Sequence, residues 1–392
     1  MVASDVELKN KSRRGMLKVI GGGVIFAAVG AGGYLATRDP SAARQPWLNV
    51  GQDEVDPRRK ALSYAILAPN PHNRQPWVIE LKGDDEIILY CDADRHIPHT
   101  DPFDRQITIG LGAFIETLAI AASKDGFRVD VDAFPEGEPM PMLDDRPVAN
   151  IRLIKDASIK ADLLFTPIVH RRSNRAAYSN EKQLPNAAIA ALSNSANHGT
   201  LVGITNETQK VARLREICVE AMRIEYVTPR TLGESIDLMR IGKSEIIANP
   251  DGISLGGPFF ETLALIGQLN RDEMRDPSSF AWKTGLDNTL SPLKTGTAYG
   301  WLVSEGNSRV DQILVGRDYA RFHLKAAELG VSIHPNSQAL QEYEEMTEQF
   351  SAIHAELGIS KPQRVQMFVR MGYGSDVKQS PRWPLASRIR KA

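Results

Sequence analysis

Two periodicities alternate along most of the chain. Short segments that are apolar, or in which apolar and polar residues alternate, predict strands, and the three-residue break 83–85 predicts a hairpin between the first two. These strands are expected at 77–81, 86–91, 127–134, 149–155, 298–304 and 365–369. Apolar residues three or four apart predict helices at 58–67, 110–124, 185–193, 208–223 and 317–329, while 312–315 fits a strand or a helix. The pattern indicates an α+β fold with a mixed sheet flanked by helices.

Two of the expected helices share a spacing of small residues. Gly112, Ala122 and Gly126 recur 204 residues later as Gly316, Ala326 and Gly330. The match fits an internal repeat, and it equally fits two ordinary helices that each end at a glycine. If it is a repeat, the proline-rich connection 136–147 is the best boundary. The expected units are then 46–148 and 149–392.

Residues 226–296 interrupt the second unit. They contain an apolar helical face within 230–249, a glycine-rich break at 252–258, a short apolar helix at 259–270, and a stretch of little periodicity at 276–296. We interpret 226–296 as an inserted lid that covers a site, and call it the lid segment. A helical insertion of no functional weight is the alternative.

The first 45 residues have the features of an export signal. Ser12–Lys18 reads S-R-R-G-M-L-K, which matches a twin-arginine signal, and the apolar run 19–37 follows it. Ser41 and Ala43 supply the small residues that cleavage after Ala43 requires. We therefore expect export through the twin-arginine translocase to a periplasmic or extracytoplasmic location. An uncleaved membrane anchor is the rival interpretation, because the run is just long enough to span a bilayer.

Composition narrows the classes of function. The 392 residues carry a net charge of −1, which gives no reason to expect a nucleic-acid partner. His96 and His99 lack a third ligand, so we expect no metal site. Cys91 and Cys218 lie in apolar patterns and are expected to be buried thiols. No G-x-G-x-x-G follows a strand, and no G-x-S-x-G occurs.

The stretch 68–77, A-P-N-P-H-N-R-Q-P-W, is the first candidate for binding. Pro69, Pro71 and Pro76 exclude a regular helix and favour extended geometry at Asn70 and Gln75. In an extended segment Asn73, Gln75 and Trp77 would point to the same side. Two carboxamides beside an indole could bind a flat heteroaromatic ring, whereas the alternative is a polar surface turn.

The stretch 171–175, R-R-S-N-R, is the second candidate. If it is extended, Arg171, Ser173 and Arg175 project to one side. Two guanidinium groups around a hydroxyl suit a phosphate, because they stay charged and donate in pairs. A solvated basic turn is the alternative.

Together these motifs resemble the nitroreductase family, and within it the twin-arginine-exported, single-chain branch with two fused half-units (Acg-like FMN-binding proteins). Ordinary members build two FMN sites across a dimer, each with R-x-S-x-R from one subunit and P-S-x-x-N-x-Q-P-W from the other. One copy of each motif is present here, so the resemblance implies a monomer that acts as a pseudo-dimer with one FMN.

The resemblance also implies roles for particular residues. Arg171, Ser173 and Arg175 would hold the phosphate, with Arg382 of S-P-R at 380–382 as a further contact. Pro69, Asn70, Asn73 and Gln75 would line the flavin ring and ribityl chain. Pro335, Asn336 and Ser337 fall where the family contacts flavin through backbone. Asn70 and Pro71 replace the family's two serines, and no residue matches the basic group that the family places near flavin N1 and O2.

Two functions follow from the resemblance. The first is an FMN-dependent oxidoreductase that passes electrons through flavin N5 from a small donor to a small organic acceptor, with no catalytic protein nucleophile. The second is an FMN-sequestering or storage protein whose lid blocks access to the ring.

Overall fold

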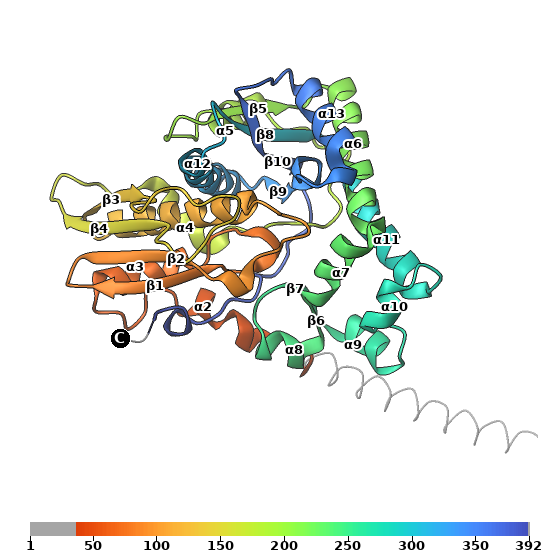
Figure 1. Cartoon of the computed structure of the whole chain (residues 1–392), viewed down its shortest axis with the longest axis horizontal. Coiled ribbons are helices and arrows are strands. Elements are labelled where there is room, and N and C mark those ends of the chain that lie inside the picture. Colours follow the sequence, from red (N-terminus) through yellow and green to blue (C-terminus); the bar gives the residue numbers. More distant parts are fainter. Residues whose placement is uncertain (1–36, 391–392) are drawn as a thin grey trace, which may run out of the picture.

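Two four-stranded antiparallel sheets, each backed by a long helix, form the centre of the molecule (Figure 1). The computed structural model describes residues 37–390. The first sheet contains β1 (Trp77–Lys82), β2 (Glu86–Cys91), β3 (Phe127–Ala133) and β4 (Ala149–Lys155), in the order β1-β2-β4-β3. The second contains β5 (Leu201–Thr205), β8 (Ala298–Ser304), β9 (Ser332–Pro335) and β10 (Arg364–Gly372), in the order β5-β8-β10-β9.

The two sheets repeat one topology. In each, the third strand in sequence lies at the edge and the fourth lies inside, and a long helix connects the second strand to the third. The helices are α4 (Arg105–Ser123) and α12 (Arg309–Glu328). This shared order supports the internal repeat, and it confirms the α+β class. Short parallel bridges, Ile79 with Ile389 and Ser173 with Ile333, add a mixed character to both sheets.

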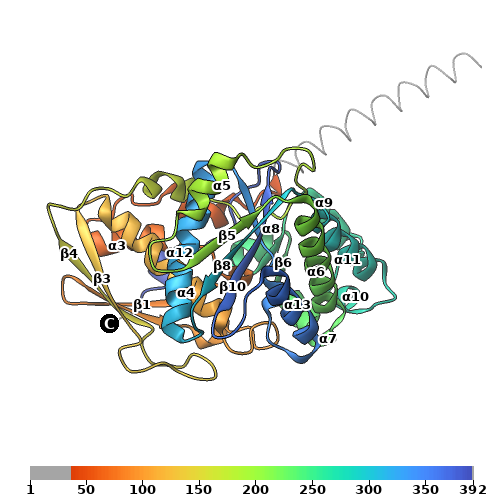
Figure 2. The ribbon, with the colours of Figure 1, turned by 90° about the horizontal axis from the view of Figure 1, so that it is seen from above.

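Two glycines of the repeat, Gly112 and Gly316, meet where α4 packs against α12 (Figure 2). A Cβ at Gly112 would lie 2.2 Å from the Ile313 carbonyl oxygen, and a Cβ at Gly316 would lie 2.1 Å from that of Ile109. Gly112 and Gly316 are 204 residues apart, as are Ile109 and Ile313, so the contact is symmetric. No side chain fits between the helices at this point, which explains why both positions are glycine.

Two buried arginines repeat the same symmetry at the starts of these helices. Arg105 donates to the carbonyls of Leu340 (2.9 Å) and Gln366 (2.7 Å) in the second half. Arg309 donates to those of Phe103 (2.6 Å) and Pro141 (2.8 Å) in the first half. Each helix is thus joined to the opposite half by hydrogen bonds from its arginine to backbone carbonyls.

The remaining helices surround this centre. They are α2 (Gln45–Leu48), α3 (Pro57–Ala65), α5 (Asn186–Ser193), α6 (Thr208–Val227), α7 (Pro229–Asp237), α8 (Gly242–Ala248), α9 (Pro258–Leu265), α10 (Arg271–Arg275), α11 (Phe280–Leu293) and α13 (Thr347–Leu357). Short 3-10 turns lie at Ser41–Arg44, Pro71–Asn73, Ala93–Arg95, Leu163–His170, Ser337–Leu340, Glu344–Met346 and Leu385–Ser387.

The lid segment has its own fold at the lower right of Figure 1. Tyr226, Leu232, Ile236 and Met274 form a separate small core, and β6 (Met239–Ile241) pairs in parallel with β7 (Ile253–Leu255). The single helix expected within 230–249 is wrong, because β6 divides it into α7 and α8. The weakly periodic stretch 276–296 contains the helix α11, whose start is capped by the Ser279 hydroxyl.

Other expectations need correction or stay outside the described residues. The boundary at 148/149 is wrong, because β4 pairs with β2 and β3 in the first sheet. Segment 312–315 is helical and belongs to α12, which begins at Arg309. Both cysteines are free and buried, as expected.

Among residues 37–390, α4 is long and apolar enough to span a membrane, but 83% of its apolar window is buried and it serves as a core helix. The export motif at 12–18 lies outside the described residues.

The glycine crossing leads to a stability prediction. Replacing Gly112 with Ala should lower the free energy of unfolding by roughly 1–3 kcal/mol or more, because the new methyl group overlaps a backbone oxygen. The control is Gly233→Ala in α7, where a Cβ meets nothing within 4 Å. That change should be neutral or stabilise by up to about 1 kcal/mol. Urea unfolding measures both, and equal stability of the two variants would contradict the close contact.

Candidate functional site

The stretch 68–77 forms a tight turn rather than an extended ledge. Asn70 is extended, as its following proline predicts, but His72, Asn73 and Gln75 have φ near 50°. The Asn70 Oδ1 accepts from the Gln75 N–H at 2.7 Å and holds this turn closed. The expectation that Asn73, Gln75 and Trp77 share one side is therefore wrong. Three non-glycine residues in the left-handed region indicate strain that the surrounding contacts maintain.

The turn lies directly on α4, next to the helix crossing. A Cβ at Gly110 would lie 3.1 Å from Pro71 Cδ and 3.2 Å from Asn70 Cβ. Gly110 stands two residues before Gly112, so this turn and the contact between α4 and α12 occupy the same part of α4. Pro69 is buried behind the turn.

Gln75 and Trp77 are structural residues in this arrangement. Gln75 is fully buried; its Nε2 donates to the Pro250 carbonyl at 2.8 Å, and its Oε1 accepts from the Trp383 N–H at 2.9 Å. Trp77 is buried against Phe114, with ring centroids 5.0 Å apart. Gln75 thus connects the turn to the lid segment and to the C-terminal segment.

Arg171 and Arg382 come together at the end of α3. Arg171 Nη2 donates to the Leu67 carbonyl at 2.9 Å, and Arg382 donates to those of Ile66 (2.9 Å) and Ala68 (3.1 Å). Arg382 Nη1 also donates to Asn73 Oδ1. The carbonyls at the end of a helix attract cations, so α3 positions both guanidinium groups. The Trp47 ring lies 5.0–5.9 Å from Arg171, Arg172 and Arg382.

This arginine cluster, Arg171, Arg172 and Arg382, has no carboxylate partner within residues 37–390. Burial lowers the pKa of Arg171 to about 10, and burial with the charges of Arg171 and Arg172 lowers the pKa of Arg382 well below its usual value. Gathering buried cations without an anion is unfavourable, and a phosphate would relieve it through charge-assisted hydrogen bonds. The donor set therefore fits a bound phosphate.

Arg175 lies apart from this cluster. Ser173 is exposed and pairs with Ile333 of β9 in an isolated parallel bridge, and Arg175 follows it by two residues. Burial and then the charge of Arg175 lower the pKa of His72 to about 4, and Arg175 also contributes to the lowered pKa of His334. The charge of Arg175 therefore acts on His72 of the first half and on His334 of the second.

Several polar atoms near Arg175 have no partner in the described part of the chain. Arg175 is exposed and makes no hydrogen bond or ion pair there, while desolvation by the surrounding protein lowers its pKa. Both side-chain atoms of the buried Asn336 and Nδ1 of His72 are also unsatisfied. Ser337 is buried, with its hydroxyl 3.9 Å from Met367 Sδ. Unsatisfied groups of this kind require a polar ligand or ordered water.

The lid segment closes over the turn through Asp251. This buried carboxylate accepts from Arg95 of the first half (2.8 Å), Arg240 of the lid (2.7 Å) and the Trp383 indole (3.1 Å). The Gly252 N–H donates to the Asn73 carbonyl at 3.2 Å, and Ser235 Oγ lies 3.5 Å from His72 Nε2. Residues 250–252 thus cover the same turn that contacts Arg382.

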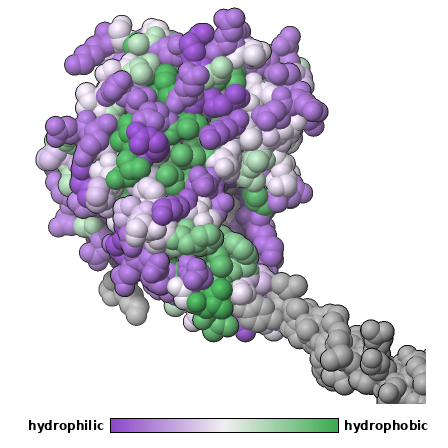
Figure 3. Space-filling view, turned by 90° about the vertical axis from the view of Figure 1, so that its right-hand side faces the viewer, coloured by the Kyte–Doolittle hydropathy of each residue, from purple (hydrophilic) through white to green (hydrophobic). Residues whose placement is uncertain are grey.

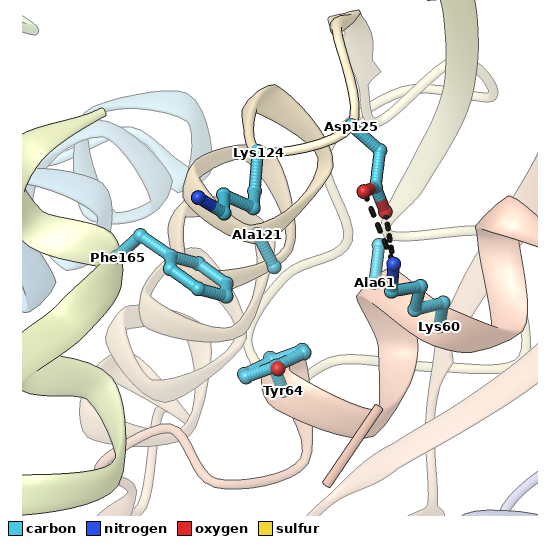
Figure 4. A pocket seen from close by; sticks show the side chains of 7 residues that line it. All are labelled: Lys60, Ala61, Tyr64, Ala121, Lys124, Asp125 and Phe165. Atoms are coloured by element: carbon cyan, nitrogen blue, oxygen red, sulfur yellow. Dashed lines mark hydrogen bonds and ion pairs between the residues drawn. The ribbon is translucent and has the colours of Figure 1, made fainter. Parts of the chain in front are cut away.

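A surface depression elsewhere does not belong to this site. It lies between α3, α4 and Phe165 and is lined by Lys60, Ala61, Tyr64, Ala121, Lys124, Asp125 and Phe165 (Figure 4). Lys60 pairs with Asp125 across it at 2.9 Å. None of the candidate binding residues lines this depression.

Sequence reasoning missed several residues of the site. His72 stands within the first motif and His334 directly before Pro335, so position alone could have indicated them. Trp47 carries no motif, yet it is buried against the arginine cluster. Asp251 and Trp383 carry no motif, and only the fold brings them to the turn.

Comparisons with known proteins point toward one family without establishing membership. No family model matches the chain. A protein of Mycobacterium tuberculosis (strain H37Rv), provisionally named an NAD(P)H nitroreductase, is 25% identical over 182 residues, which cover 46% of this chain and 50% of that protein. The nitroreductase named acg from the same strain is 32% identical over 81 residues, or 21% of this chain and 24% of acg. The chain thus spans about half the length, or less, of the curated relatives it matches.

Two solved structures give a weak structural likeness. The FMN-dependent nitroreductase NfnB from Mycobacterium smegmatis, in complex with NADPH, is 17% identical; the match covers 57% of this chain and 94% of NfnB, with a TM-score of 0.35. Iodotyrosine deiodinase bound to FMN and 3-iodo-L-tyrosine is 16% identical with the same coverages and a TM-score of 0.32. Both TM-scores are low, and these superpositions alone do not define the fold.

The Asp251 network predicts how the lid segment is held. Asp251→Asn should weaken closure by roughly 3–5 kcal/mol, because it leaves two arginines without their shared anion. Hydrogen exchange of amides in α7, α8 and β7 should accelerate. Asp287→Asn removes the same charge from an exposed position in the lid and serves as the control. Unchanged exchange in the Asp251 variant would contradict the role of this carboxylate.

The same network should depend on pH. Burial would raise the pKa of Asp251, but hydrogen bonds from Trp383, Arg240 and Arg95 outweigh it and lower the pKa. A carboxylate with a lowered pKa stabilises the closed form above its ordinary value of about 4 and loses this effect as the pH falls through the lowered value. Exchange in the lid, corrected for its intrinsic pH dependence, should stay constant from neutral pH to about 5 and rise below about 4.

Proposed function

We propose that this protein is an FMN-dependent oxidoreductase of the nitroreductase type, with one flavin bound between its two halves. The observation that carries the proposal is the pair of unbalanced cationic groups at the seam: the arginine cluster, which has no carboxylate, and Arg175, which has no partner within residues 37–390. The partial matches to proteins named as nitroreductases support the same assignment.

The arginine cluster would hold the phosphate. Arg171 is fixed by the Leu67 carbonyl and keeps further N–H donors available. The N–H groups of Arg382 all bond to protein acceptors, so Arg382 would contribute mainly its positive charge. Asn73 bonds Arg382 from the turn, so the turn and the phosphate site would be ordered together. The exposed Ser173 hydroxyl lies in the same segment and would add a neutral donor.

Arg175 would serve the ring rather than the phosphate. Positions 171 and 175 of an extended segment are separated by roughly 13 Å along the chain, which suits the two ends of one elongated ligand. The charge of Arg175 acts on His72 and His334, and the bridge between Ser173 and Ile333 places its segment beside β9, which Asn336 follows. Because burial keeps both histidines neutral at pH 7, Arg175 would supply the positive charge for an anionic ring. This assignment would provide the basic group near flavin N1 and O2 for which the sequence has no separate motif.

The chemistry would come from the flavin, which accepts a hydride at N5 and passes electrons to a second substrate. The protein would contribute binding, orientation and exclusion of water. Residues 250–252 of the lid would shield the ring from solvent, and the neutral amide of Asn336 would offer both a donor and an acceptor. A small electron donor and a small organic acceptor would use the same pocket in turn.

Cofactor identity and the phosphate site can be tested together. Heat-released cofactor should run as FMN in chromatography, and FAD or no flavin would overturn the proposal. Arg171→Ala should weaken FMN binding about 10- to 150-fold, because it removes one charge-assisted contact worth roughly 1.5–3 kcal/mol. The control is Arg223→Ala, at an exposed arginine of α6 that pairs with Glu220. Equal affinity of wild type and the Arg171 variant would place the phosphate elsewhere.

Substitutions at Arg175 should change the redox potential of the bound flavin more than they change its affinity. Arg175→Met should lower the midpoint potential of the bound flavin, because the positive charge that favours the anionic reduced ring is lost. Arg175→Lys should restore most of the potential, whereas Arg171→Ala should change affinity more than potential. Spectroelectrochemical titration measures these values. A potential unaffected by Arg175→Met would contradict its place beside the ring.

Turnover distinguishes an enzyme from a flavin-sequestering protein. Stopped-flow reduction by dithionite and by NADPH should be compared in wild type and in Asp251→Asn, whose lid is loosened. An enzyme should be reduced and reoxidised in wild type by at least one physiological donor. Reduction of the variant alone would instead identify the protein as an FMN store.

A further inference from the structure

Helix α9 has an apolar surface that nothing in residues 37–390 covers. Its sequence P-F-F-E-T-L-A-L contains no buried residue. Phe259, Leu265 and Ile266 keep 64%, 81% and 61% of their surface exposed. We call these three residues the α9 patch. Figure 3 looks onto the side of the molecule that carries the lid segment and shows apolar surface at its lower end. Three large apolar side chains exposed together indicate a site of contact with another protein or with a membrane.

The described chain begins beside this helix. Arg38 Nη1 pairs with Glu261 Oε2 of α9 at 3.1 Å, and Lys243 Nζ of α8 donates to the Thr37 carbonyl at 2.9 Å. Gly256, just before α9, lies against Pro40. The apolar run 19–37 therefore ends within one or two residues of contacts to α8 and α9.

The expected cleavage position lies inside the fold. Ala43 is 5% exposed within the 3-10 turn Ser41–Arg44, and its carbonyl accepts from the Arg382 N–H at 2.9 Å. Trp47 follows, buried at 4% exposure, and its indole donates to the Ser380 carbonyl at 2.9 Å. The expectation that the fold begins after residue 45 is wrong, because residues 38–47 pack onto it. Proteolysis requires accessible and unpaired backbone, whereas Ala43 at the expected cleavage position is buried and both its N–H and its carbonyl are hydrogen-bonded.

We infer that segment 19–37 stays attached and spans the membrane, and that the α9 patch lies in the interface of the same lipid bilayer. Nineteen residues in a helix extend roughly 28 Å, close to the thickness of the hydrocarbon core. Because Thr37 and Arg38 are fastened to α8 and α9, a bilayer spanned by this run must lie next to the α9 patch. Apolar side chains on a surface helix then insert into the boundary between headgroups and acyl chains.

Processing tests the first part of the inference. The full chain should be expressed in a bacterium with an active twin-arginine route and fractionated, and its intact mass should be measured. The expected result is an exported protein that keeps residues 19–37, remains in membranes after carbonate washing, and is released by detergent. A soluble exported chain that begins at Arg44, or a chain that is not exported, would overturn the inference.

The position of the α9 patch tests the second part. Leu265→Cys should be labelled with a nitroxide in the full chain, where Cys91 and Cys218 are buried and compete little. The protein is placed in nanodiscs at one chain per disc. The expected result is more frequent collision with oxygen and exclusion of a water-soluble nickel complex, as in lipid. The control is Asp132→Cys on an exposed position of β3, which should collide with nickel.

Other occupants of the α9 patch give different signals. Cover by protein, including residues 1–36 of the same chain, would exclude both oxygen and nickel. A label open to nickel would mean that the patch faces water. A patch covered by a second copy would become open to nickel when only one chain is present per disc. Each of these outcomes would overturn the inference.

Discussion

The close approach of α4 and α12 is the constraint on which the rest of the structure depends. With Gly112 and Gly316 in contact, the two halves have one allowed relative position, and Arg105 and Arg309 fix it through carbonyls of the opposite half. Gly110, two residues before Gly112 on the same helix, contacts the turn at Asn70 and Pro71. The geometry of the proposed flavin site is therefore set by the same packing that joins the halves.

The two halves share a topology, but they contribute unequally to the site. The first half joins β1 to β2 by a three-residue turn, 83–85, whereas the corresponding connection from β5 to β8 contains α6 and the lid segment. That insertion returns to the first half through Asp251, and the C-terminal segment returns to it through Arg382. Only one of the two pseudo-equivalent places on the seam thus receives a complete set of polar groups.

Local patterns in the sequence predicted the regular elements well and the site incompletely. Apolar runs at 86–91 and 298–304 and the alternation at 149–155 predicted three strands at their observed bounds, because burial of a strand on one or both faces leaves a strong signal in the sequence. The turn at 70–75 was mispredicted, since the Asn70 carboxamide outweighs the extended preference of the residue before Pro76. The position of Arg175 relative to Arg171 depends on the pairing of Ser173 with β9. The role of Asp251 depends on its contacts with Trp383 and Arg95, which are 132 and 156 residues away in sequence. No local pattern contains such contacts.

A crystal structure of the purified protein with its native cofactor tests the central claim most directly. The account predicts one FMN per chain, with its phosphate against Arg171 and Arg382, its ring beside Arg175 and Asn336, and residues 250–252 over the turn. Two flavins per chain, or a single flavin away from the seam between α4 and α12, would contradict it.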